Sequence, residues 1–84
     1  MIQVLTHQDI TFIVDSLKNN PYTKAKFLAK ACHCSIETIY NFSKLLKQRG
    51  YLLISGEPNR QRKYWLSIES VENVVKDVEK FYYD

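Results

Sequence analysis

The chain has 84 residues, of which 45% are hydrophobic and 25% charged, and its formal net charge is +3. This length suits one small domain spanning residues 1–84, and the composition is typical of a globular protein rather than a disordered one. No apolar run is long enough to span a membrane, and the first residues lack the features of a secretory signal. We therefore expect a cytoplasmic protein without a membrane partner.

Charge is distributed unevenly along the chain. Between Lys24 and Arg49 six basic residues accompany one acid, and between Glu57 and Lys63 three basic residues accompany one acid. The last segment, from Glu69 onward, has five acids and two bases. A basic middle and a basic loop, followed by an acidic end, are the electrostatic pattern expected of a protein with one phosphate-facing surface.

Hydrophobic periodicity predicts two helices in the first part of the chain. Thr6 and Asp9 resemble a capping box, and the apolar residues that follow predict a helix over residues 7–18. Thr23 is expected to cap a short second helix over residues 24–31. Its apolar face would be formed by Phe27, Leu28 and Ala31, and its basic side by Lys24, Lys26 and Lys30.

A third helix is predicted between Ser35, a helix-capping residue, and Gly50, which can take the left-handed conformation that ends a helix. Its apolar stripe consists of Ile36, Ile39, Leu45 and Leu46, with Phe42 close by. Its opposite face consists of Glu37, Thr38, Tyr40, Asn41, Lys44, Lys47 and Gln48. A short helix with an apolar back and a hydrogen-bonding, basic front is what a DNA major groove admits, although an ordinary surface helix has the same pattern.

After Gly50 the sequence predicts a β-hairpin and a fourth helix. Strand-like segments 51–55 and 63–67 flank turn-forming and basic residues, which would form a long basic tip. Apolar residues at helical spacing then predict a final helix capped by Ser67 or Ser70. These apolar residues are Ile68, Val71, Val74, Val75, Val78, Phe81 and Tyr82.

The order helix, helix, helix, hairpin, helix, with a tight turn at residues 32–34, resembles the winged helix-turn-helix superfamily over essentially the whole chain. Ala29 matches the small residue that the family places in the first helix of its motif. His33 replaces the glycine that is usual in the turn, and histidine is among the residues that tolerate a positive φ. The expected fold is therefore mainly α with a small β-hairpin, in a winged helix-turn-helix arrangement.

The resemblance implies a small DNA-binding regulator of transcription that binds double-stranded DNA sequence-specifically, with the helix after Ser35 in the major groove. On that helix the expected DNA contacts are Ser35, Thr38, Tyr40, Asn41 and Lys44, and Lys24 on the preceding helix would add a contact to the DNA backbone. In the wing, the expected contacts to phosphates or a minor groove are Asn59, Arg60, Gln61, Arg62 and Lys63. Two alternatives stay open: Tyr40 packs on the preceding helix, and Glu37 complements the helix dipole rather than contacting cytosine.

The apolar stripe of the last helix is long for a segment that covers one side of a small core. It either packs wholly within its own domain or forms part of a homodimer interface, together with the first helix and the N-terminal segment. The expected interface residues are Val71, Val74, Val75, Val78, Phe81 and Tyr82. A dimer would place two recognition helices about one turn of DNA, roughly 34–36 Å, apart.

Two other functions fit the same features. One is a plasmid or phage partition protein that binds centromere or origin repeats, as TubR-type winged-helix adaptors do. The other is a winged-helix module that binds only a second protein. No catalytic constellation is evident, so we expect no enzyme activity and no cofactor. Cys32, His33 and Cys34 with His7 match a zinc site poorly, because structural zinc uses separated pairs of ligands, and we expect no metal.

Overall fold

A computed structural model describes residues 4–55 and 62–83. In these ranges the chain forms α1 (His7–Asn19), α2 (Ala25–Ala31), α3 (Ile36–Gln48), β1 (Leu52–Ser55), β2 (Arg62–Trp65) and α4 (Val71–Tyr82). The prediction of a mainly helical fold with a small hairpin is confirmed, and the layout is compatible with a winged helix. None of the helices in the described ranges has the length and apolar character needed to cross a membrane.

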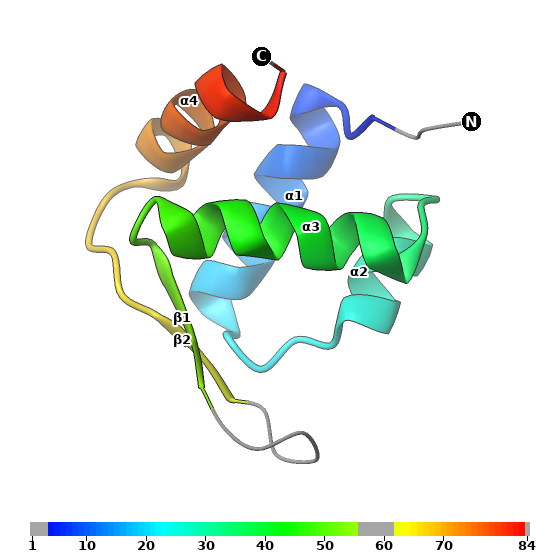
Figure 1. Cartoon of the computed structure of the whole chain (residues 1–84), viewed down its shortest axis with the longest axis horizontal. Coiled ribbons are helices and arrows are strands. Elements are labelled where there is room, and N and C mark those ends of the chain that lie inside the picture. Colours follow the sequence, from blue (N-terminus) through cyan, green and yellow to red (C-terminus); the bar gives the residue numbers. More distant parts are fainter. Residues whose placement is uncertain (1–3, 56–61, 84) are drawn as a thin grey trace.

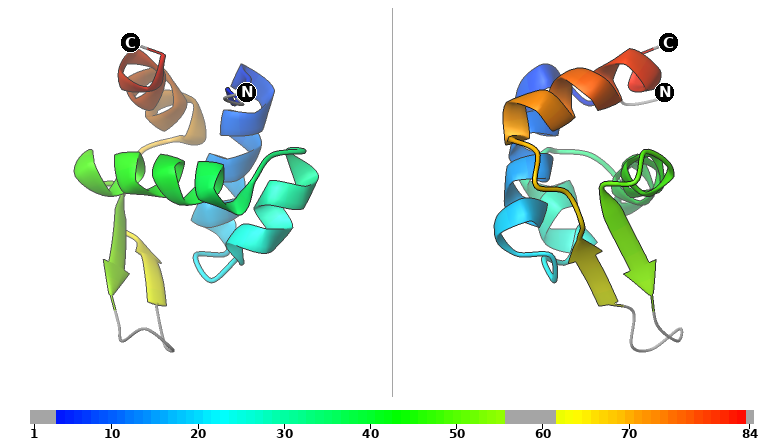
Figure 2. Two further views of the ribbon diagram at one scale, coloured as in Figure 1. Left: turned by 45° about the vertical axis from the view of Figure 1, so that its right-hand side comes forward. Right: turned by 90° about the vertical axis from the view of Figure 1, so that its left-hand side faces the viewer.

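The helices pack in two pairs that α3 joins. α1 packs against α4 and α2 against α3, while α3 also contacts α4 and β1. α3 crosses the front of the molecule, and the hairpin descends from its C-terminal end (Figure 1). The two strands are antiparallel, with Leu52 opposite Trp65 and Ser55 opposite Arg62. The views of Figure 2 place α4 above the C-terminal end of α3 and the hairpin below it.

Side-chain caps start three of these helices. Thr6 and Asp9 form the predicted capping box at α1. Ser35 and Ser70 each accept a hydrogen bond from the backbone N–H three residues later, at 3.1 and 3.2 Å. The choice between Ser67 and Ser70 as the cap of the last helix is thereby decided for Ser70. Each cap satisfies an N–H that would otherwise lack a partner inside its helix.

The predicted cap of α2 was wrong. The N-cap residue is Lys24, and its side chain makes no capping hydrogen bond. Thr23 lies one residue earlier, where its N–H donates to the carbonyl of Asn20 at 3.0 Å and closes the turn after α1. Thr23 therefore belongs to the turn, and α2 begins later than its sequence pattern indicates.

Two left-handed residues end α2 and α3 as predicted. His33 has a φ of 54° and Gly50 a φ of 82°. In both cases the next amide donates to the carbonyl five residues before it, at 3.0 Å. This is the Schellman arrangement, which reverses the chain tightly after a helix. It turns the chain from α2 into α3 at His33 and from α3 into β1 at Gly50.

One hydrophobic core joins all of the helices to β1. Its largest fully buried side chains are Leu5, Ile10, Ile13, Val14, Leu17, Leu28, Ile39, Phe42, Leu46, Leu52, Val74 and Val75. Five residues of the predicted apolar stripes are exposed instead, namely Phe27, Ala31, Ile36, Ile68 and Phe81. Ile68 is 98% exposed because α4 begins only at Val71, so Ile68 precedes the helix and takes no part in its stripe. Phe27 points outward and meets Phe12 of α1, with ring centroids 6.4 Å apart.

Candidate nucleic-acid interface

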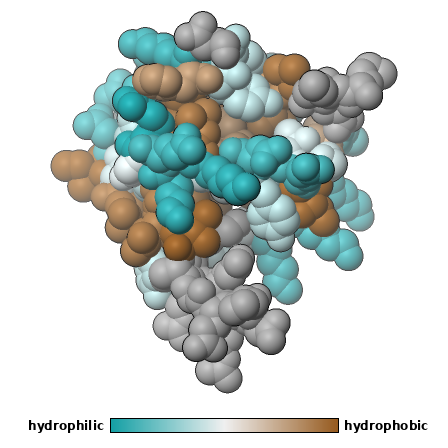
Figure 3. Space-filling view, viewed as in Figure 1, coloured by the Kyte–Doolittle hydropathy of each residue, from teal (hydrophilic) through white to brown (hydrophobic). Residues whose placement is uncertain are grey.

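The outward face of α3 is exposed and polar. Asn41 and Lys44 are exposed near its middle, Tyr40 is 50% exposed at one edge, and Thr38 is half-buried at the other. In Figure 3 hydrophilic side chains form a band across the middle of the molecule, where α3 lies. The fold thus brings the predicted residues of this helix to one accessible surface, with Ser35 exposed at its start.

Ser35 and Thr38 have a second task at the start of α3. The Ser35 hydroxyl accepts from the Thr38 N–H, and the two hydroxyl oxygens are 2.9 Å apart. One hydroxyl proton lies between the two oxygens, so the other remains able to donate to an external acceptor. The pair can therefore contact a phosphate oxygen without giving up the cap.

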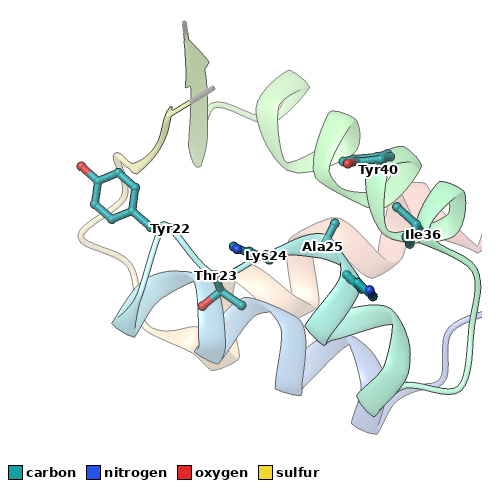
Figure 4. A pocket seen from close by; sticks show the side chains of 7 residues that line it. Tyr22, Thr23, Lys24, Ala25, Ile36 and Tyr40 are labelled. Atoms are coloured by element: carbon teal, nitrogen blue, oxygen red, sulfur yellow. The ribbon is translucent and has the colours of Figure 1, made fainter. Parts of the chain in front are cut away.

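Lys24 and Tyr40 lie on opposite sides of a crevice between the start of α2 and α3. The crevice has a volume of about 420 Å³ and is lined by Tyr22, Thr23, Lys24, Ala25, Lys26, Ile36 and Tyr40. Tyr40 and Ile36 project from α3 above the first residues of α2, and Tyr22 lies at the far end (Figure 4). Tyr40 therefore faces the start of α2 across the crevice, and half of its surface stays accessible.

The hairpin is joined to this region by aromatic contacts. Tyr64 of β2 meets Tyr22 edge to face, with ring centroids 6.2 Å apart. Arg62 and Lys63 belong to β2, on the strand that contains Tyr64. The other predicted wing contacts, Asn59, Arg60 and Gln61, lie outside the described residues.

Arg49 is paired within the chain, although it counts toward the basic segment of the sequence. Its Nε donates to Oδ2 of Asp77 at 3.0 Å and its Nη2 to Oδ1 at 3.1 Å. Its guanidinium carbon also lies 4.2 Å from the ring centroid of Phe81. This bidentate pair ties the end of α3 to α4. The positive charge available on the α3 side therefore comes from lysines, not from Arg49.

Tyr51 completes a three-residue cluster with Arg49 and Asp77. Its hydroxyl donates to Oδ2 of Asp77 at 2.6 Å. The hydrogen bonds from Arg49 and Tyr51 stabilise the carboxylate and lower the pKa of Asp77. The same hydrogen bond to Asp77, with desolvation, raises the pKa of Tyr51 to about 12. The sequence offered no signal for this cluster, because its members lie 26 and 28 positions apart.

The predicted dimer interface was wrong for three of its residues. Val74, Val75 and Val78 are at most 2% exposed and belong to the core of their own chain. Tyr82 is also partly used inside the chain, where it meets Phe42 edge to face at 5.6 Å. The core of so small a domain needs these side chains, since α4 is what covers α1 and α3. Of the predicted interface, Phe81 is exposed, and Val71 and Tyr82 are each partly accessible.

A shallow groove lies between α1 and α4. It has a volume of about 440 Å³ and is lined by His7, Thr11, Val71, Glu72, Val75 and Lys76. Valines form its floor, and the oppositely charged Glu72 and Lys76 lie 3.7 Å apart at its rim. Val71 is half-buried there and Val75 is almost wholly buried, so the groove exposes little apolar surface and its accessible side chains are mainly polar.

The two cysteines are free thiols. Cys32 is buried, and burial raises its pKa to about 11; burial also raises the pKa of the half-buried Cys34. A raised pKa keeps a thiol protonated and poorly nucleophilic near neutral pH. Within residues 4–55 and 62–83 no group of three or more histidines, cysteines and acids is placed to hold a metal ion.

Aliphatic side chains lie exposed on and after the hairpin. Leu53 is 42% exposed, Leu66 57% and Ile68 98%. Leu53 is on β1 opposite Tyr64, and Leu66 directly follows the end of β2, two residues after Tyr64. Figure 3 shows hydrophobic side chains at the lower left, beside the hairpin.

Comparisons of this chain with known protein families, with curated proteins and with solved structures found no match.

Proposed function

We propose that this protein is a winged-helix DNA-binding protein that inserts α3 into the major groove of double-stranded DNA and regulates transcription. The observation that supports this most is the exposed face of α3, where Asn41 and Lys44 are accessible side by side. The amide of asparagine pairs with an adenine edge, and lysine reaches guanine or a phosphate. The left-handed turn at His33 presents this face by directing the chain sharply from α2 into α3.

Phosphate contacts would flank the groove contacts. Ser35 and Thr38 retain a hydroxyl proton at the start of α3, and Lys24 lies on the other side of the crevice beside Tyr40. The basic residues of the wing, Arg62 and Lys63 among them, would extend the contact to the DNA backbone beyond the hairpin. Such contacts contribute affinity for any sequence, whereas Asn41 would contribute preference for one.

The proposal is tested by selecting bound duplexes from a random pool and measuring affinity against salt concentration. Lys44→Ala should weaken binding to all sequences and reduce the salt slope by about 1. Lys80→Ala is the matched control, because Lys80 is an exposed lysine on α4. Asn41→Ala should relax base preference more than it reduces binding to random DNA. Equal effects of the two lysine variants, or no selected sequence, would contradict the proposal.

We propose that two copies pair and bind two half-sites. The groove between α1 and α4 is the surface that supports pairing, because its rim carries Glu72 and Lys76 one helical turn apart. In an antiparallel, two-fold pairing of α4 helices, Glu72 of each copy faces Lys76 of the other. The rim is therefore complementary to itself.

Charge reversal tests this pairing directly. Glu72→Lys places like charges together in its own homodimer, and so does Lys76→Glu, so each variant alone should sediment as a monomer. A mixture of the two should form a heterodimer, since every contact then joins opposite charges. Asn73→Lys, on the same helix, is the control for added charge. Failure of the mixture to associate would reject the groove as the interface.

A protein-binding role is the second candidate, and the exposed Leu53, Leu66 and Ile68 favour it. Exposed aliphatic patches of this kind are typical of protein contacts. A steep salt dependence of DNA affinity would decide against a module that binds only proteins. A partition role would be favoured over transcriptional regulation if the selected sequence recurs as closely spaced repeats that are loaded cooperatively.

A further inference from the structure

Asp77 is the point at which α4 holds both parts of the proposed DNA surface. Its carboxylate accepts two hydrogen bonds from Arg49, the residue that follows the last turn of α3, and one from Tyr51, the residue that precedes β1. Its side chain is only 24% exposed. These three charge-assisted hydrogen bonds fix the chain on either side of Gly50, where α3 turns into the hairpin.

The contact continues from Tyr51 into the second strand. The rings of Tyr51 and Trp65 stack, with an interplanar angle of 15° and centroids 6.4 Å apart. Trp65 is opposite Leu52, at the end of the hairpin nearest α3. The N–H of Leu66 also donates to the carbonyl of Tyr51 at 2.9 Å. Asp77, Tyr51 and Trp65 therefore form a continuous connection from α4 to both strands at the base of the hairpin.

We propose that Asp77 is a positioning residue that sets the angle between α3 and the hairpin, so that both can contact the same DNA duplex. This inference rests on the proposed DNA-binding function and adds that α4 controls the geometry of binding without touching DNA. α3 passes into the hairpin through the short segment 49–51, whose backbone turns at a left-handed glycine, and α3 also contacts β1 directly. The hydrogen bonds of Asp77 tie this segment to α4 as well, so they further restrict rotation of the hairpin relative to α3.

Phe81, one helical turn after Asp77 on α4, also contacts Arg49. The Arg49 guanidinium lies over its ring while it pairs with Asp77, so it is held by a planar contact as well as by two hydrogen bonds. Lysine in place of Arg49 would keep the charge but lose the fork geometry that fits both carboxylate oxygens. The orientation of Arg49, and not only its charge, is therefore part of the connection.

The experiment uses Asp77→Asn and Tyr51→Phe in the full chain. Asp77→Asn removes a negative charge, so Asp15→Asn, at an exposed acid of α1 that belongs to neither the proposed DNA surface nor the pairing groove, controls for the change in net charge. Trp65 is the only tryptophan of the protein and reports on the base of the hairpin by its fluorescence. Without DNA, Asp77→Asn and Tyr51→Phe should each change the emission and anisotropy of Trp65 under conditions where circular dichroism shows them folded. Asp15→Asn should leave both signals unchanged.

DNA affinity then separates positioning from stability in a double-mutant cycle with Arg62→Ala, a change on β2. In the otherwise unchanged chain, Asp77→Asn should weaken binding by about 3- to 30-fold. In the Arg62→Ala background Asp77→Asn should weaken binding much less. The Arg62→Ala change has already removed the DNA contact of the hairpin, so misplacing the hairpin then costs little further affinity. Arg49→Lys should give an intermediate loss.

Three outcomes decide between the ideas. Equal losses in both backgrounds would overturn the positioning role, since a general loss of folded protein acts on every contact alike. An unchanged Trp65 signal in Asp77→Asn would also overturn it, whether or not DNA binds. A changed Trp65 signal with no DNA binding by the unmodified chain would keep the connection between α4 and the hairpin and reject the proposed function instead.

Discussion

The backbone N–H of Leu5 donates a hydrogen bond to the hydroxyl of Tyr82, 77 positions later, at 2.9 Å. The carbonyl of the same residue accepts from the hydroxyl of Tyr83 at 2.7 Å. Leu5 itself is 1% exposed. The two tyrosines thus satisfy both backbone groups of a residue whose side chain fills the core, and they hold the segment before α1 against the end of α4.

Removing these hydroxyls should destabilise the fold without altering its packing. Tyr82→Phe keeps the ring that meets Phe42 but leaves the buried N–H of Leu5 without its acceptor, so we expect a loss of about 1–3 kcal/mol in the free energy of unfolding. Urea denaturation measures this. Tyr22→Phe, at an exposed tyrosine outside this contact, should have little effect. An equal loss in both variants would show that the hydroxyl of Tyr82 has no special role.

Alanine substitutions at Ser35, the N-cap of α3, and at Ser43 within α3 should change the stability of the protein in opposite directions. Ser43 is 1% exposed, and in the described part of the chain its hydroxyl has no hydrogen-bond partner, so Ser43→Ala should stabilise by about 1 kcal/mol. Ser35→Ala removes the cap and should destabilise by about 1 kcal/mol. Thermal unfolding of both variants checks the pair. Destabilisation by Ser43→Ala would mean that its hydroxyl is satisfied in solution, for example by water.

Stability should fall at both extremes of pH because of the Asp77 cluster. The pKa of Tyr51 is raised from its ordinary value of 10.0 to about 12, so the folded protein keeps the phenol protonated after the unfolded chain has ionised. The stabilisation is complete below pH 10 and is lost as the pH rises from there through about 12. The pKa of Asp77 is lowered from 3.8, so its stabilisation is present above that value and is lost on further acidification.

Free energies of unfolding measured across the alkaline and the acid pH range test the direction of both predicted changes in stability. Tyr51→Phe should lack its share of the alkaline loss, and Asp77→Asn should lack its share of the acid loss. The tyrosine variant retains Asp77 and its hydrogen bonds from Arg49 but loses the one from Tyr51, so its acid loss should lie between those of the unmodified chain and Asp77→Asn. Identical alkaline profiles for Tyr51→Phe and the unmodified chain would remove Tyr51 as the titrating group.

Gly50 is needed for its backbone conformation rather than for space. An added Cβ would meet no atom within 4 Å, but the φ of 82° is left-handed. Gly50→Ala should therefore cost about 1–2 kcal/mol through backbone strain alone. Gly50→Asn should cost less, because asparagine visits this region more readily. If chemical denaturation gives the two variants the same stability, backbone strain is not the main cause of the destabilisation.

The local parts of the fold could be predicted from the sequence because their signals lie within a few residues. The caps at Thr6, Ser35 and Ser70 and the left-handed residues at His33 and Gly50 are of this kind. The exposed polar face of α3 followed from helical spacing in the same way. Each of these features depends on residues that lie within a few positions of one another, and not on which helices pack together.

The remaining features depend on which elements meet, and a single sequence does not contain that information. The spacing of apolar residues correctly predicted the helix α4. Which partner its apolar stripe meets depends on packing, and in the structure Val74, Val75 and Val78 fill the core of the same chain. In the sequence Arg49 is one more positive charge of the basic segment, whereas in the structure it pairs with Asp77 of α4. The periodicity that included Ile68 did not reveal where the last helix begins.

The hairpin consists of two strands, so among the described residues each strand has one side on which no further strand pairs. Such open edges invite pairing between molecules, and lysine or arginine on an edge strand is a common protection against it. Arg62 and Lys63 occupy positions in β2, so the sequence places residues of this protective kind on an edge strand. Neutralising them to test DNA contacts also removes this protection against aggregation, so light scattering must accompany every affinity that such variants yield.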